Sequence, residues 1–170
     1  MKYQITITEE DYLQFNLFYT YHTNSGKHTF RTIQFIMPVF SVLFLLLLLI
    51  TGTESYMLLT FSLVLAVSSV IMYFRASKIL QKNMSQLLKR MKKDGKLPYH
   101  ASAEIEFQDS MIIERHEQGE FRLKYEDVEH IYFEDDYLYI FFSAAQALIL
   151  PYRCLGNEKE RLTEFLRGIL

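Results

Sequence analysis

Two long segments without a charged residue constrain this chain more than any other feature. Residues 33–50 read IQFIMPVFSVLFLLLLLI, and residues 56–74 read YMLLTFSLVLAVSSVIMYF. Each approaches the roughly 20 apolar residues that a helix needs to cross about 30 Å of hydrocarbon. A buried hairpin in a soluble protein is the alternative, but a chain of 170 residues has too little further mass to enclose two helices that are apolar all round. We therefore predict a two-helix transmembrane hairpin.

The charged residues that flank the apolar segments predict how the hairpin is oriented. Lys27 and Arg31 precede the first segment, and a basic stretch follows the second, whereas the loop between them has only Glu54. Because positively charged loops stay in the cytoplasm, both termini should be cytoplasmic. Residues 1–30 lack the apolar core of a cleavable signal peptide, so the first helix should direct insertion. The single cysteine, Cys154, fits a reducing compartment.

Charge is distributed unevenly, although the net charge is only −2. Residues 75–96 hold eight Lys and Arg against one Asp, whereas residues 97–170 carry a net charge of −8. An acidic C-terminal part argues against nucleic acid as a partner, because binding to phosphates requires clustered Lys and Arg. We interpret residues 75–96 as a juxtamembrane helix beside anionic headgroups, or as a stalk that packs on the C-terminal part or on a second copy. The candidate headgroup contacts are Arg75, Lys78, Lys82, Lys89, Arg90, Lys92, Lys93 and Arg153.

The N-terminal part, residues 1–31, is predicted to hold one strand and one aromatic helix. Residues 3–8 are strand-like, and Thr8 is a candidate N-cap for a helix over residues 9–22 that stops at Asn24-Ser25-Gly26. Its aromatic side chains wrap more than one face. The helix therefore either packs on the soluble part or lies at the membrane surface.

Within the hairpin (32–74, with helices at about 33–50 and 56–74), neither helix contains an ionisable residue. This argues against an ion pathway or a proton relay. Pro38 favours a kink or is tolerated in the first turn. Ser62, Ala66 and Ser69 form a stripe of small residues that suits close contact with the first helix or with a second copy.

The sequence pattern of residues 101–170 predicts an antiparallel meander followed by one helix. Alternation and tight turns predict strands at 103–108, 111–116, 121–125, 128–133, 137–142 and 147–150. Asn157 is a candidate N-cap for a helix over 158–170, whose apolar stripe should cover one end of the sheet. The basic helix before the meander should end at Gly95. The predicted class is thus an α+β membrane protein, with a pleckstrin-homology-like domain as one candidate for the C-terminal fold.

Several stretches resemble the YcxB-like family of bacterial membrane proteins. They are ITEEDY (7–12), the hairpin, and YEDVEHIYFEDDYLYIFFSAAQALILPYRCL (125–155). The resemblance implies a small protein of the bacterial inner membrane, with a cytoplasmic domain related to pleckstrin-homology-like folds and with no enzymatic activity or cofactor to carry over. The family usually has Lys-Arg after the proline at 151; here Tyr152 replaces the lysine, which argues against a paired basic site.

No pattern in the chain indicates catalytic, cofactor or metal chemistry. The five histidines lack metal-ligand spacing, and there is no GxSxG, P-loop or GxGxxG motif. The densest set of potential ligands is Glu126, Asp127, Glu129 and His130, but strand alternation sends its members to different sides. Aromatic residues at 132–142 suit a sheet core, and any exposed surplus would suit a protein-binding face.

We therefore expect a non-enzymatic membrane protein whose cytoplasmic domain binds or regulates a protein partner at the membrane. One version is an immunity or accessory protein. Recognition of anionic lipid is the alternative, a membrane-bound enzyme is a weaker one, and association with a second copy stays open. A further interpretation is that the strand at residues 3–8 completes the C-terminal sheet, with the hairpin inserted into one domain.

Overall fold

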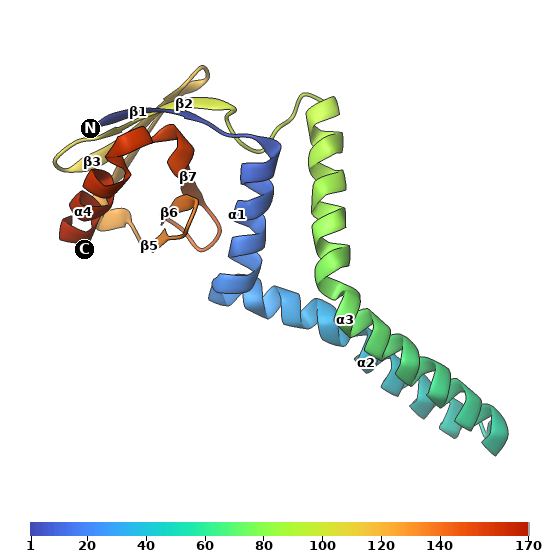
Figure 1. Ribbon diagram of the computed structural model, residues 1–170. Helices are drawn as coiled ribbons and strands as arrows, with labels where there is room; N and C mark the ends of the chain where they lie inside the picture. Colours follow the sequence, from blue (N-terminus) through green and yellow to red (C-terminus); the bar gives the residue numbers. More distant parts are fainter. Residues whose placement is uncertain (170) are drawn as a thin grey trace. The chain divides into compact units, whose positions relative to one another are not determined.

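The computed structural model describes residues 1–169 and has an α+β architecture with two compact units (Figure 1). One unit, here called the β-domain, comprises residues 1–17 and the chain from residue 88 onward. The other, the hairpin unit, comprises residues 18–87. The β-domain is therefore discontinuous in sequence, because the hairpin unit is inserted after the first strand and the beginning of the first helix.

The first sheet of the β-domain is antiparallel throughout and has the order β1-β2-β3-β4. Its strands are β1 (Lys2–Thr6), β2 (Ser102–Phe107), β3 (Met111–His116) and β4 (Gly119–Lys124). In the pairing of β1 with β2, Lys2 lies opposite Glu106 and Ile5 lies opposite Ala103. The N-terminal strand thus belongs to the same sheet as the strands that follow the hairpin unit.

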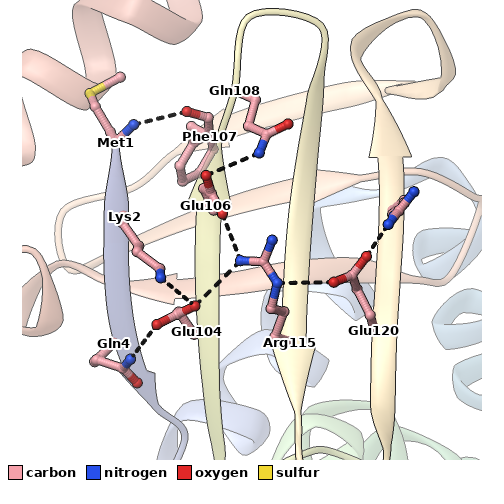
Figure 2. A network of polar contacts seen from close by, with 10 residues as sticks. Met1, Lys2, Gln4, Glu104, Glu106, Phe107, Gln108, Arg115 and Glu120 are labelled. Carbon is pink, nitrogen blue, oxygen red and sulfur yellow. Dashed lines mark hydrogen bonds and ion pairs between the residues drawn. The ribbon is translucent and has the colours of Figure 1, made fainter.

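The two faces of this sheet differ because apolar and charged residues alternate along the strands. One face carries Ile5 and Ile105 into the core. On the opposite face Arg115 lies between acidic residues of its neighbouring strands, 2.6 Å from Glu106 and 2.9 Å from Glu120 (Figure 2). Lys2 and Gln4 add contacts of 2.9 Å to Glu104. Arg122 also pairs with Glu120 at 2.5 Å, so three basic and three acidic side chains offset one another and this face presents a balanced network.

The second sheet has the order β5-β6-β7 and is also antiparallel. Its strands are β5 (His130–Phe133), β6 (Tyr137–Phe141) and β7 (Ala147–Pro151). Strand β6 is buried on both sides: Leu138 and Ile140 face the core, while Tyr139 and Phe141 contact Phe15. Phe15 belongs to helix α1 (Glu9–His22), so its N-terminal part packs on this sheet, as one of the two alternatives predicted.

The burial of the aromatic residues at 132–142 agrees with the prediction that most of them belong to the sheet core. None of the six at 132–142 is exposed, and Tyr139 and Phe141 are fully buried. These six rings therefore leave no exposed surplus for a protein-binding face, and Phe15 of helix α1 contacts two of them, Tyr139 and Phe141.

Helix α4 (Lys159–Ile169) completes the core of the β-domain, which lies between the two sheets and this helix. Leu162 and Leu166 are fully buried in the same cluster as Ile112 and Leu150. Asn157 is not its N-cap: it lies in a 3₁₀ turn (Gly156–Glu158) whose first residue, Gly156, has a φ of 56°, and the α-helix begins only at Lys159. The predicted last residue, 170, lies outside the described part of the chain.

Two long helices form most of the hairpin unit, α2 (Asn24–Ile50) and α3 (Ser55–Lys93). Both are long and apolar enough to span a membrane. The side chains of Ser41 and Ser69 lie 3.1 Å apart and join the two helices, so Ser69 of the predicted small stripe does face the first helix. The helix α3 ends where the glycine pattern predicted, because Gly95 adopts a φ of 67° and the amide of Lys96 bonds back to Met91.

Helix α2 begins much earlier than the apolar pattern indicated. The side chain of Thr23 accepts a hydrogen bond of 3.0 Å from the amide of Gly26, which caps the helix. A Cβ at Gly26 would lie only 2.0 Å from the carbonyl oxygen of Tyr19, so this close turn needs glycine. The stretch predicted as a stop is therefore the first turn of α2. As a consequence Pro38 lies inside the helix and not in its first turn.

Candidate functional site

A cleft of about 390 Å³ opens within the β-domain and is its best candidate for a binding site. Its walls come from both sheets, from the start of α1 and from the loop that precedes β2. Most of the lining is apolar, with Ile5, Ile105 and Leu148 among its members. A concave apolar surface with a few polar groups is the usual form of a ligand site.

Glu114 is the one carboxylate in the described lining of this cleft. In β3 it lies opposite Ile105 of β2 and Phe121 of β4. Because side chains two residues apart share a face of a strand, Glu114 lies on the same side as Ile112, which is fully buried. The sheet therefore directs an acidic side chain towards the core side and not towards the balanced network on its other face.

The surroundings of Glu114 do not favour its charged form. Burial raises the pKa of its carboxyl above the usual value, and the nearby imidazoles of His100 and His116 offset only part of this effect. Within residues 1–169 no group donates a hydrogen bond to this half-buried carboxylate, and its oxygens remain accessible to solvent in the cleft. The cleft thus holds an acidic group that lacks a protein partner.

Two histidines stack beside this group. The rings of His100 and His116 have centroids 3.5 Å apart and planes within 10° of each other. The Nδ1 atom of His116 accepts a hydrogen bond from the amide of Gln118 at 3.2 Å. Both histidines also line a second cavity of about 320 Å³, which shares Tyr99 and His100 with the first. The loop that carries Tyr99 therefore contributes to both cavities.

A second carboxylate, Asp11, is only 1% exposed and is completely engaged. It forms a capping box with Thr8, whose amide and hydroxyl donate hydrogen bonds of 2.6 and 2.7 Å to Asp11 Oδ2. Arg153 donates one bond of 2.5 Å to each carboxylate oxygen, and the hydroxyl of Tyr137 donates another of 3.0 Å. We call Thr8, Asp11, Tyr137 and Arg153 the Asp11 cluster.

The hydrogen bonds of the Asp11 cluster hold its carboxylate in the charged form. Burial alone raises the pKa of Asp11, but the bonds from Arg153, Thr8 and Tyr137 outweigh it and lower the pKa to about 2. The same arrangement raises the pKa of Tyr137 to about 12, through burial first and then through its bond to Asp11. Both carboxylate oxygens of Asp11 accept hydrogen bonds, and the cluster joins the start of α1 to the chain beyond β7. We therefore assign it a role in stabilising the fold.

The residues predicted to contact lipid headgroups fall into three groups. Arg75, Lys78 and Lys82 line one open hollow of about 500 Å³ in the hairpin unit, together with Phe74 and Ile79. In the β-domain Lys92 pairs with Glu9, and Arg153 is bound to Asp11. The remaining three are exposed on α3, namely Lys89, Arg90 and Lys93.

Two further predicted features can be located. Tyr152, which replaces the usual lysine, is buried, and the amine of Lys159 lies 3.8 Å from the centre of its ring. Within residues 1–169 no three His, Cys, Asp or Glu side chains are grouped in a way that could hold a metal ion. In the predicted acidic set, Glu126 pairs instead with Lys124 at 2.8 Å.

Sequence reasoning did not identify the Glu114 cleft, although one local signal pointed to it. In β3 the alternating positions Ile112, Glu114 and His116 place an acid and an imidazole in line with a core residue. Most of the other residues that line the cleft come from segments that are distant in sequence, and no local pattern reveals that they meet Glu114.

Comparison with known protein families gives one match. Residues 107–166 match the model of the YcxB-like protein family, which confirms the resemblance over that part of the chain. The matched part includes Glu114, Tyr137 and Arg153. Neither the curated proteins nor the solved structures gave a match.

Proposed function

We propose that this protein spans the bacterial inner membrane twice, with both termini in the cytoplasm, and that its β-domain binds a protein partner there. The distribution of apolar surface supports the membrane location. Among the described residues, every exposed large hydrophobic side chain except Ile169 lies between Ile33 and Leu87. Such a surface is costly in water and is expected in lipid. The Lys and Arg that flank the hairpin favour cytoplasmic termini.

The topology can be tested with single cysteines. We would replace Cys154 with alanine and introduce cysteine either at Thr53, between the two apolar helices, or at Ser143, in the loop after β6. A membrane-impermeant maleimide should label Thr53→Cys in intact cells and should label Ser143→Cys only after the cells are broken. Equal labelling of both positions in intact cells would contradict the proposed orientation.

The β-domain is proposed to be pleckstrin-homology-like. A four-stranded and a three-stranded antiparallel sheet followed by one C-terminal helix, in the order β1–β4, β5–β7 and α4, support this assignment. In this reading the hairpin unit is an insertion between β1 and β2. The membrane segment would thus hold a folded module at the bilayer.

The observation that carries the proposed binding function is the cleft of about 390 Å³ with Glu114. Its lining in the described chain has no Ser, Thr, Cys or Lys side chain to serve as a nucleophile beside this acid. The arrangement therefore favours recognition over catalysis. A partner that is neutralised or regulated at the membrane, as with an immunity or accessory protein, would suit such a module.

Site-specific crosslinking in membranes tests this function. A photoreactive residue would be placed at Ala145, which is exposed and lines the cleft, and at Glu164, which is exposed on α4 and does not line it. We expect a discrete adduct with one identified protein from position 145, and its loss when Ala147, also in the lining, is replaced by tryptophan. Equal adducts from both positions, or adducts with chaperones only, would contradict the proposal.

Recognition of anionic lipid is a second candidate, favoured by the hollow that Arg75, Lys78 and Lys82 line together. Basic side chains beside an apolar span attract anionic headgroups. The full chain is needed for a test, because a fragment that starts at residue 75 lacks β1. In nanodiscs with equal amounts of phosphatidylglycerol and phosphatidylcholine, the protein should retain phosphatidylglycerol preferentially. The preference for phosphatidylglycerol should fall when the basic residues at 75, 78 and 82 are all replaced by glutamine. It should persist when those at 89, 90 and 93 are replaced instead.

A further inference from the structure

We propose that the cleft binds a lysine or arginine side chain of the partner protein, with the Glu114 carboxylate as its acceptor. This inference rests on the proposed partner binding and names the chemical group that the cleft recognises. It assigns a role to an acid on the core side of the sheet to which no group in residues 1–169 donates a hydrogen bond.

The shape of the cleft suits such a side chain. Glu114 lies on the core side of β3, and Ile5, Ile105 and Leu148 contribute apolar walls. Lysine and arginine have long apolar stems with the charge at the tip, so the stem can lie along apolar walls while the tip reaches an acid. A neutral apolar side chain would fill the volume but would leave the carboxylate without a donor.

Aromatic rings in the lining favour a cation further. Tyr99 belongs to the described lining, and its ring stacks on that of Tyr12 with centroids 5.0 Å apart. His100 is also part of the lining and is held by its stack on His116. The face of a tyrosine ring such as that of Tyr99 attracts guanidinium and ammonium groups, and arginine more often than lysine, whereas His100 contributes a flat wall of fixed orientation.

Electrostatics point in the same direction. The groove belongs to a part of the chain with net negative charge, since residues 97–170 carry −8. Burial raises the pKa of Glu114 by more than the imidazoles of His100 and His116 lower it, so the surrounding protein compensates its charged form only in part. A bound cation would supply the missing hydrogen bonds and opposite charge, and bonds of this kind contribute more than neutral ones.

The test uses the full chain in detergent micelles and two matched peptides. The probes are acetyl-Gly-Arg-Gly-amide and the same peptide with citrulline, which keeps the shape of arginine and removes its charge. Methyl NMR signals of Ile5 and Ile149, both in the lining, report binding. We expect saturable shifts with the arginine peptide and binding at least about tenfold weaker with the citrulline peptide.

Two variants locate the effect. Glu114→Gln, which preserves size, should abolish the preference for arginine over citrulline. Glu164→Gln, an exposed acid on α4 outside the cleft, should preserve it. Equal binding of the two peptides to the unaltered protein, or an arginine preference that survives Glu114→Gln, would overturn the inference.

This outcome can be separated from the fate of the proposed function. If position 145 crosslinks to one partner and Glu114→Gln leaves that adduct unchanged, partner binding stands and the role of Glu114 fails. If position 145 gives no specific adduct while the arginine preference depends on Glu114, the cleft recognises cations and the proposed protein partner fails.

Discussion

Two carboxylates in the β-domain, the buried Asp11 and the half-buried Glu114, have opposite surroundings. Asp11 receives hydrogen bonds from Thr8, Tyr137 and Arg153, and its pKa is lowered to about 2. Glu114 receives none from the described residues, and burial raises its pKa. An acid whose oxygens all receive protein hydrogen bonds has no donor capacity left for a ligand, whereas a half-buried acid that is bonded only by solvent can exchange that water for a ligand's donor. This contrast is why we assign structure to the first and recognition to the second.

The largest expected effect comes from Arg153→Ala. The substitution leaves the buried Asp11 charge without its bidentate partner, and we expect a loss of about 3 kcal/mol in the free energy of unfolding. Denaturant unfolding of the β-domain, followed by tyrosine fluorescence in detergent, measures this loss. Arg161→Ala is the matched control, because Arg161 is exposed and its ion pair with Glu158 is long, at 3.9 Å. This substitution should change the free energy of unfolding by less than about 0.5 kcal/mol. Similar losses in both variants would remove the structural role of the cluster.

The second largest effect is expected in the dependence of stability on acidic pH, which should differ between Asp11 and Glu114. The folded-state pKa of Asp11 lies below its unfolded value of 3.8, so its stabilisation is present above about pH 4 and is lost as the pH falls towards 2. We expect a steep loss of stability in this window for the unaltered protein and a shallower one for Arg153→Ala. Parallel stability profiles for the two proteins between pH 5 and pH 2 would argue that Asp11 is not held by Arg153.

The smallest effect on stability is expected for Glu114→Gln, which should stabilise the folded protein, whereas Arg153→Ala should destabilise it. The folded-state pKa of Glu114 is raised, so the folded protein loses stability as the pH rises from the unfolded pKa through the folded one. Glu114→Gln removes this loss, and we expect stabilisation on the order of 1 kcal/mol or less at neutral pH. Thermal unfolding at pH 7 measures it. Destabilisation by this substitution would mean that Glu114, like Asp11, supports the fold.

Local patterns predicted much of the architecture because they depend on neighbouring residues only. Residues 111–116 were predicted as a strand with the observed bounds, and residues 9–22 as the observed helix. The end of this helix before Asn24 was predicted correctly, because a polar triplet with glycine usually ends a helix, but the start of the next helix at Asn24 was not predicted. Here the Thr23 cap and the close approach of Gly26 to Tyr19 turn the same residues into a helix start.

Arg153 shows why the candidate sites were harder to predict. As a basic residue near a membrane segment it fitted a headgroup contact, but in the fold it binds Asp11, which lies 142 residues earlier in the chain. Glu114 lies in a strand that was predicted, but only the fold shows that it lines one cleft together with the second sheet and the loop at residues 98–100. In both cases the surroundings of the residue are set by strand order and register. A local sequence pattern reveals neither the strand order nor the register.

By itself, then, the sequence determined the two apolar helices, the alternating strands and the uneven distribution of charge, because hydrophobic periodicity and charge are properties of contiguous residues. Only the tertiary structure decided that the first strand joins the second across the inserted hairpin unit, that Asp11 is saturated and that Glu114 is not. These outcomes depend on contacts between distant segments, which form only when the two sheets and α1 pack together.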